Sequence, residues 1–431
     1  MRRAGRVERF TSPGVLASTA IALVLRVGYV LAAKRDQPLL GDQIYYGFQA
    51  QTLAAGHGFT HPVFGGPAAD HPPVTALLMT PVAYFTDSIT AQRLAMAVIG
   101  TAVVVAIAYL THLVAGARAA VVAAAIAAVY PNLWVNDALV MSDAPTALVV
   151  AALLIAVYRW RARPTVGGAA LFGLAAGIGM LTRAELMLLV VLVGVPALFT
   201  VREITPAGRM RQSAVAMGVA LGVVALWIVP NLVRFDRPVL LSTNDGLTLV
   251  GANCDSTYNG GGIGFWDLRC APPPVGDESQ QAEQYRSDAV DYVRDHLDHV
   301  PVVVAARVGR VWGVFRPFDM VFLNQGEGRE QWVSRLGIWA WWALAPLAAA
   351  GAVVLRRRGT PVWALLAPFV TVTATAAVFY GIVRFRVPAE VSAVVLTAGL
   401  LAELSRKWWP DPSPIARREG SAATPAPRPP G

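Results

Sequence analysis

Long apolar runs constrain this chain more than any other feature. Segments such as 14–33 and 336–355 contain about 20 apolar residues, the length that a helix needs to cross a bilayer. Only 15% of the residues are charged, whereas soluble domains carry about 25%. The first run ends at 34–36 without a small-residue cleavage site, which disfavours a secretory signal peptide. The sequence therefore predicts an all-α, multi-pass membrane protein.

The basic residues predict its orientation. Arginines cluster between apolar runs at 159–163, 202–211, 356–358 and 406–418, the pattern of segments retained in the cytoplasm. This distribution accounts for the net charge of +9 without a nucleic-acid partner. About ten spans result, with both termini cytoplasmic. They are expected at 14–33, 91–114, 118–134, 140–158, 167–182, 185–201, 213–233, 336–355, 361–381 and 388–404.

The same topology divides the chain into parts. A cytoplasmic N-terminus at 1–13 precedes a membrane domain at 14–404, and a Pro- and Arg-rich tail at 405–431 is expected to be disordered. Two larger loops, 34–90 and 235–335, are expected outside. The second has 10 arginines against 14 acidic residues between positions 234 and 335.

Two shorter apolar segments fall within these loops. Segment 74–85 is interrupted by Pro81, and segment 300–315 by Arg307 and Arg310. Counting 74–85 as a span would place the arginines at 159–163 outside. We therefore expect both segments to be juxtamembrane helices on the outer face.

Asp42 opens an amphipathic stretch in the first loop, with Tyr45 on a related face. The structural interpretation is an N-cap that accepts backbone N–H bonds. The functional interpretation is a carboxylate that takes a proton from a hydroxyl group at the membrane surface.

Asp70 and His71 follow in the same loop, before a pair of prolines. They either open the next helix or contribute to a site. His57, His61 and His71 could bind a divalent metal with a carboxylate, but Gly58 and Pro62 interrupt a shared helical face. A metal ion is therefore the less favoured interpretation, and we expect no required cofactor.

Several arginines contradict the charge rule and need another explanation. The topology places Arg384, Arg386 and Arg183 at outer helix ends, and Arg26 in the outer half of the first span. They either anchor helices at the interface, with Arg183 paired to Glu185, or form a cationic pocket. Guanidinium groups bind phosphate in a bidentate manner, so the pocket would suit an anionic lipid headgroup.

Both cysteines, Cys254 and Cys270, lie in the second large loop. Outside the cytoplasm a disulfide between them is favoured over two free thiols. A zinc site would need further ligands nearby.

The ordered set of motifs resembles the GT-C glycosyltransferases, in particular the protein mannosyltransferase-like family and the lipid A aminoarabinose transferases. The resemblance extends to about residue 404. Its motifs are Asp42–Tyr45, Gly56–Gly58, His71–Pro73, Ala91–Leu94, Pro131–Asp143, Leu181–Arg183 and Arg384–Pro388.

This resemblance implies a polyprenyl-phosphate sugar donor, transfer outside the cytoplasm with inversion, and a protein, lipid or glycan acceptor. The general base falls on Asp42, and a second acid falls on Asp143 or Asp137. Protein mannosyltransferases usually have Glu after the first acid, where this chain has Gln43.

We assign the remaining site residues by their place in the outer loops. Arg384, Arg386, Arg183 and Arg26 are predicted to bind the donor phosphate. Tyr45, Asp70, His71 and Glu185 are predicted at the sugar or acceptor. The second large loop is expected to shape the acceptor side through Asn244, Asp245, Tyr258 and Trp266.

Two rival functions remain. A transporter or lipid flippase would also have many helices and an outward cationic pocket, but it should show internal repeats and ionisable residues at mid-span. A non-catalytic scaffold of the cell envelope would leave Asp42 dispensable.

Overall fold

The computed structural model describes residues 12–62, 65–200 and 204–405. The predicted N-terminal segment lies almost wholly outside this range, and so does the predicted tail after Ser405. Helices account for nearly all the regular structure. Within the described ranges, the β pairing is limited to an isolated bridge between Thr60 and Pro67.

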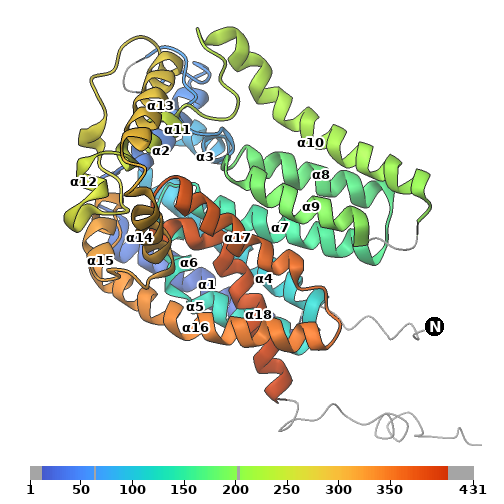
Figure 1. Cartoon of the computed structure of the whole chain (residues 1–431). Coiled ribbons are helices and arrows are strands. Elements are labelled where there is room, and N and C mark those ends of the chain that lie inside the picture. Colours follow the sequence, from blue (N-terminus) through green and yellow to red (C-terminus); the bar gives the residue numbers. More distant parts are fainter. Residues whose placement is uncertain (1–11, 63–64, 201–203, 406–431) are drawn as a thin grey trace, which may run out of the picture.

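Long helices form a bundle (Figure 1). Its members are α1 (Pro13–Tyr29), continued by a π-helical turn at Val30–Lys34, α4 (Ile89–Ala115), α5 (Ala117–Val129), α6 (Pro131–Trp134), α7 (Asp143–Ala162), α8 (Val166–Met180), α9 (Leu186–Thr200), α10 (Pro206–Arg234), α16 (Gln331–Arg357), α17 (Trp363–Val378) and α18 (Val387–Ser405).

Seven further helices gather at one end of this bundle, and we call them the outer cap after the predicted topology (Figure 1). They are α2 (Asp42–Ala54), α3 (Val74–Phe85), α11 (Asn244–Ala252), α12 (Asp255–Tyr258), α13 (Glu278–Asp295), α14 (Val300–Trp312) and α15 (Asp319–Leu323). Five 3₁₀ turns, η2 to η6, connect elements at Asn136–Ala138, Gly260–Gly262, Leu268–Cys270, Asn324–Glu327 and Val383–Arg386. The two predicted juxtamembrane helices are α3 and α14.

Every predicted span contains a helix, but their lengths differ. Within the described part of the chain, six helices are long and apolar enough to cross a membrane. The pair of α5 and the segment after it, bent by 57°, would make a seventh if it is one span. The remaining three, α8, α9 and α17, are apolar but have only 15 or 16 residues. The multi-pass architecture is therefore confirmed, whereas the number of ten spans stays a prediction.

The most buried helix is α18, which packs against α16, α17 and α5. Small residues allow these close approaches. A β-carbon at Gly351 of α16 would overlap the backbone of Leu396 in α18, and one at Gly173 of α8 would overlap that of Ala216 in α10. Membrane helices commonly use such contacts, because lipid supplies little hydrophobic drive for helix association.

The two ends of the bundle differ in composition as the charge pattern predicts. The start of α7, the turn between α8 and α9, and the end of α17 meet the outer cap. The other end of α7, the start of α8 and the turn between α16 and α17 bring Arg159, Arg163 and Arg358 together. The predicted outer loops thus share one end, and these arginines the other.

Candidate active site

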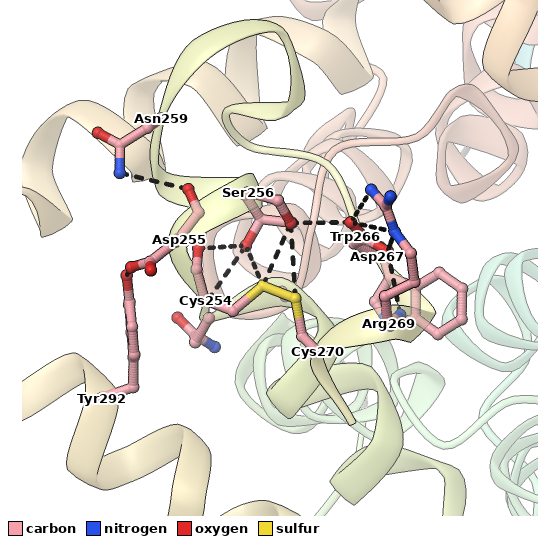
Figure 2. The surroundings of a disulfide bond; sticks show 12 residues. Cys254, Asp255, Ser256, Asn259, Trp266, Asp267, Arg269, Cys270 and Tyr292 are labelled. Carbon is pink, nitrogen blue, oxygen red and sulfur yellow. Dashed lines mark hydrogen bonds and ion pairs between the residues drawn. A yellow bond between two sulfur atoms is a disulfide. The ribbon is translucent and has the colours of Figure 1, made fainter. Parts of the chain in front are cut away.

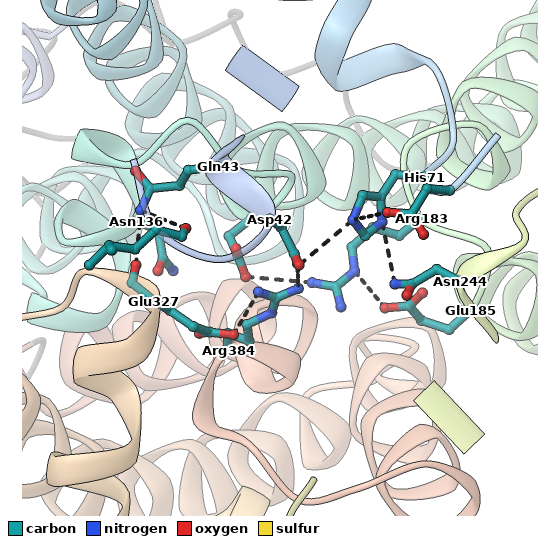
Figure 3. A network of polar contacts seen from close by, with 12 residues as sticks. Asp42, Gln43, His71, Asn136, Arg183, Glu185, Asn244, Glu327 and Arg384 are labelled. Atoms are coloured by element: carbon teal, nitrogen blue, oxygen red, sulfur yellow. Dashed lines mark hydrogen bonds and ion pairs between the residues drawn. The ribbon is translucent and has the colours of Figure 1, made fainter. Parts of the chain in front are cut away.

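A cavity of about 520 Å³ lies between the outer cap and the bundle ends that face it. Its wall combines the start of α2, the loop before α3, the turn between α8 and α9, α11, η5 and η6. Figure 3 shows the charged side chains that meet there. Aromatic side chains supply much of the apolar wall. These are Phe265, Trp266, Phe379, Tyr380 and Phe385.

Asp42 is the first residue of α2 and lines the cavity. The preceding Gly41 has a φ of 56°, a left-handed conformation that glycine adopts without strain. Asp42 makes no capping bond to its helix; its Oδ2 accepts a hydrogen bond from Arg384. Its Oδ1 lies 3.7 Å from His71 Nε2. The carboxylate therefore belongs to the cavity and not to a helix cap.

Arg384 joins three distant parts of the chain. It lies in η6 and is 6% exposed, and its guanidinium donates to Asp42 and to Glu327 Oε1, the latter at 2.8 Å. Figure 3 shows this guanidinium between the two carboxylates. The predicted meeting of the first-loop acid and the C-terminal arginine thus occurs through Arg384.

Glu327 was not predicted from the sequence. It ends η5, lines the cavity, and is held in place by Gln43, whose Nε2 donates to the Glu327 carbonyl at 3.0 Å. The available signal was an acidic residue between Gly326 and Gly328 near the end of the long loop. That signal is weak, because such turns are common on protein surfaces.

Arg183 forms the second cationic group of the cavity. It sits in the turn between α8 and α9 and pairs with Glu185, the contact expected from the structural alternative, and its Nη1 lies 3.5 Å from Asp143 Oδ1. Its guanidinium also packs over the Phe385 ring, 5.1 Å from the centroid. Arg183 and Glu185 both line the cavity.

The two candidates for the second acid, both within the Pro131–Asp143 motif, lie in different surroundings. Asp143 is fully buried at the start of α7, next to the cavity residue Ser142, and faces Arg183. Asp137 instead accepts a hydrogen bond from Arg26 at 2.6 Å and packs against Gly100 inside the bundle. Only Asp143 of this pair reaches the charged cluster.

The predicted phosphate-binding arginines therefore divide into two groups. Arg384 and Arg183 line the cavity, whereas Arg26 is bound to Asp137 and to backbone carbonyls of α5. Arg386 points into the bundle, where it pairs with Glu390 at 2.8 Å and lies over the Trp341 ring. Because neither Arg26 nor Arg386 is among the residues that line the cavity, we withdraw both from the phosphate site.

His71 and Asp70 form the side of the cavity next to Asp42. His71 Nε2 lies 3.4 Å from Asp70 Oδ2, and its Nδ1 is 3.5 Å from the side-chain amide of Asn244. The His71 ring stacks on Tyr46, with centroids 4.8 Å apart. A second cavity of about 230 Å³ opens nearby, lined by Asp42, Asp70 and His71 together with Tyr45.

These charges perturb one another. Burial would raise the pKa of Asp42, but Arg384 and His71 more than offset it and hold this pKa well below its ordinary value. Burial would lower the pKa of His71, but Asp70 and Asp42 raise it overall. The pKa of Asp70 is raised by burial. Asp42 is thus ionised at neutral pH, beside an imidazole that favours the protonated state.

The second large loop brings three of its four named residues to the cavity, and their role on the acceptor side stays a prediction. Asn244, Asp245 and Trp266 line the cavity. Tyr258 does not; it is buried within the cap, where its hydroxyl donates to Asn253 at 2.8 Å.

The predicted disulfide between Cys254 and Cys270 is present (Figure 2). It ties the start of α12 to η4, near Asp267, whose carboxylate accepts from Ser256 and pairs with Arg269. Because Asp267 and Trp266 reach the cavity wall, the disulfide holds one of its edges.

Among the described residues, no group of three or more His, Cys, Asp and Glu side chains is arranged to hold a metal ion. His61 and His71 both line the smaller cavity, beside Asp42 and Asp70.

Comparisons with known proteins show what this chain resembles. A model of the dolichyl-phosphate-mannose-protein mannosyltransferases matches residues 70–233. This stretch contains Asp70, His71, Asp143 and Arg183, but neither Asp42 nor Arg384. A comparison with curated protein sequences found no match.

Solved structures of an oligosaccharyltransferase share the fold, and a third solved structure is less similar. The Archaeoglobus fulgidus oligosaccharyltransferase in its apo form has a TM-score of 0.55 at 14% identity, over 95% of this chain and 51% of that one. AglB from the same organism, in complex with an inhibitory peptide and a dolichol-phosphate, has a TM-score of 0.51 at 16% identity. The match covers 98% of this chain and 53% of that one. ArnT from Cupriavidus metallidurans, bound to undecaprenyl phosphate, has a TM-score of 0.43 at 15% identity, over 95% of this chain and 81% of that one.

The chain has the fold of the GT-C membrane glycosyltransferases. The resemblance to the protein mannosyltransferase-like group is confirmed by the family match within it. The chain spans about half the length of the oligosaccharyltransferases that it matches.

Proposed function

We propose that this protein is a membrane glycosyltransferase that moves a sugar from a polyprenyl-phosphate donor to an acceptor hydroxyl outside the cytoplasm. The observation that carries the proposal is the convergence of Asp42 and Arg384, 342 positions apart, in one cavity next to the bundle. A base and a cation side by side are what transfer from a phosphoester requires. The matched family model points to the same chemistry and gives no support to a transporter.

The reaction follows from these two groups. The acceptor oxygen attacks the anomeric carbon while its proton passes to Asp42, and the bond from that carbon to the phosphate oxygen breaks. Polyprenyl phosphate leaves with the bonding electrons, and attack opposite to it inverts the anomeric centre. Arg384 and Arg183 neutralise the charge that develops on the phosphate. A general base contributes about 10²–10⁴-fold to such a step.

The ligand-free ion pairs suggest how the base is activated. Arg384 holds Asp42 in a state of low basicity, because the cation stabilises the carboxylate. A bound donor phosphate competes for the same guanidinium and weakens that pair. The basicity of Asp42 then rises when the donor is in place. Donor binding should therefore precede productive acceptor binding.

Asp143 acts through Arg183 in this proposal. Its carboxylate is fully buried and faces the Arg183 guanidinium, whose other side pairs with Glu185. The two acids fix the guanidinium in one orientation beside the cavity. Asp143 is thus a positioning residue for the phosphate site.

The acceptor side is assigned to His71, Asp70 and Tyr45. These residues surround the smaller cavity, which meets the main cavity at Asp42 and His71. An acceptor hydroxyl that enters from this side reaches Oδ1 of Asp42, the oxygen beside His71, whereas Arg384 donates to Oδ2. Protein, lipid and glycan acceptors all carry suitable hydroxyl groups. The donor panel described next identifies the sugar.

The proposal is tested with purified protein and a panel of polyprenyl-phosphate sugars, with release of polyprenyl phosphate as the readout. Asp42→Asn should abolish release from the active donor while leaving the folded protein intact. Asp36→Asn is the matched control, because Asp36 is an exposed first-loop acid that does not line the cavity. Full activity of the Asp42 variant would remove this residue from the base role.

A further inference from the structure

A larger cavity of about 1300 Å³ opens at the end of the bundle away from the active site. It lies between α4, α7 and α8, beside the turn that joins α16 to α17, and we call it the arginine groove. The transferase chemistry proposed above makes no use of it. Its volume exceeds the range of about 300–1,000 Å³ that is typical of small-molecule pockets.

The groove is cationic at its mouth. Arg159, Arg161, Arg163 and Arg358 line it, and its described lining contains no acidic residue. Arg358 is partly neutralised by Glu403. Within the described part of the chain, neither Arg159 nor Arg163 pairs with a carboxylate, and Arg159 reaches across to the Tyr109 hydroxyl at 3.5 Å. A fixed excess of positive charge thus faces the opening.

The N-terminus of α8 adds to this field. Thr165 caps the helix by accepting from Gly168 N, and the space beside Gly167 is open. The first N–H groups of a helix carry a partial positive charge and favour phosphate. They lie in the same mouth as the arginines.

The interior of the groove is apolar and long. On α7 its lining runs from Arg163 back to Val149, and on α8 it extends to Ile178. Fourteen residues of α-helix cover about 21 Å, which is more than half of the roughly 30 Å hydrocarbon core of a bilayer. A compact anion would leave this length empty, whereas a lipid chain fills it.

We infer that the arginine groove binds an anionic phospholipid of the leaflet opposite the active site. Its phosphate would lie between Arg159, Arg163 and the start of α8, and one acyl chain would run along α7 and α8. The charge rule places this end in the cytoplasm. Basic pockets between membrane helices on that side suit phosphate headgroups.

The test uses a phosphatidylglycerol analogue with a photoreactive group on its acyl chain, added to the full-length protein in phosphatidylcholine nanodiscs. We expect labelling within 149–156 of α7 and 171–178 of α8. Arg159→Gln combined with Arg163→Gln should weaken labelling by about 30-fold, since each arginine near a membrane surface contributes about fivefold to anion binding. Arg356→Gln with Arg357→Gln is the matched control, because these exposed arginines lie at the same end outside the groove.

A second variant blocks the path of the acyl chain without altering the charge of the groove. Ala152→Trp places a large ring in the groove lining and should abolish labelling of both segments. An unchanged extent of labelling in either variant would overturn the proposal. Equal labelling by a phosphatidylcholine analogue would also overturn it, as would stronger competition by polyprenyl phosphate than by phosphatidylglycerol. Size-exclusion chromatography and thermal unfolding confirm that each variant is folded.

Discussion

Replacing Arg384 by Gln removes the one cation that serves both Asp42 and Glu327. Two effects on the proposed reaction follow. The leaving phosphate loses an electrostatic partner, and loss of one such donor typically costs about 10²–10³-fold in rate. Donor affinity falls as well, because the phosphate loses a bidentate partner. We expect kcat/KM for the donor to fall by at least about 10²-fold.

The pH dependence provides the sharper readout. In the native protein Arg384 keeps the pKa of Asp42 well below its ordinary value, so the base stays ionised as the pH falls toward 5. Without the cation, burial raises this pKa, and the carboxyl group becomes protonated at a higher pH. The acidic limb of the kcat/KM profile should therefore move upward. A merely structural arginine would lower activity without moving that limb.

The assay measures polyprenyl phosphate release between pH 4 and 9 with the active donor. Arg384→Lys keeps the charge, but one ammonium group cannot reproduce the fork that reaches two carboxylates, so it should be intermediate. Arg237→Gln is the control, because its pair with Glu283 is exposed on the cap. An unchanged kcat/KM together with an unmoved acidic limb in Arg384→Gln would refute the reasoning.

The remaining predictions concern Asp137, Asp143 and the outer cap. Asp143→Asn should raise the donor KM, because Arg183 loses a partner. Asp137→Asn should mainly lower the free energy of unfolding, by about 3–5 kcal/mol, because it leaves the buried Arg26 unpaired. A raised KM in the Asp137 variant and a lowered stability in the Asp143 variant would contradict this assignment. Burial raises the pKa of Glu278 from 4.5 to about 7, so stability should fall as the pH rises from 4.5 to 7. Glu278→Gln should remove this dependence and stabilise the protein at pH 8 by up to about 3 kcal/mol, as measured by thermal unfolding. Replacing Cys254 and Cys270 by Ser opens a link across 16 residues and should destabilise the cap by about 3 kcal/mol, which limited proteolysis would detect.

The sequence predicts the fold well, because the bilayer imposes simple rules. A spanning helix needs length and low charge, and both are visible in the composition of each run. Bends and shortened helices are not visible in this way. The break between α5 and the turn that follows it depends on Pro131 and on packing around Trp134. The 16-residue helix α17 was likewise predicted as the longer span 361–381.

The candidate site is partly predictable for the same reason. Asp42 and Arg384 were predicted as site residues because charged side chains at outer helix ends cost free energy unless they are paired or functional. Arg386 shows the limit of this argument. Two residues apart in the tight turn of η6, Arg384 faces the cavity while Arg386 faces the bundle. The spacing of four between Arg386 and Glu390 was the one local sign of that internal pair.

Glu327 could not be placed from the sequence, since its role depends on a contact with a residue 57 positions away. Loop residues gain such partners only from the tertiary fold. No local pattern distinguishes this glutamate from the other acids of the long loop.

The bridge from Arg384 to Asp42 also has a consequence for biosynthesis. Because the N-terminal acid enters the membrane surface long before the guanidinium is translated, the charged centre is completed only when the last helices insert. Ribosomes that stop early would release chains with many inserted helices and an unmatched carboxylate. The bridge therefore requires synthesis through Arg384, and pieces made separately should regain it only if they assemble side by side.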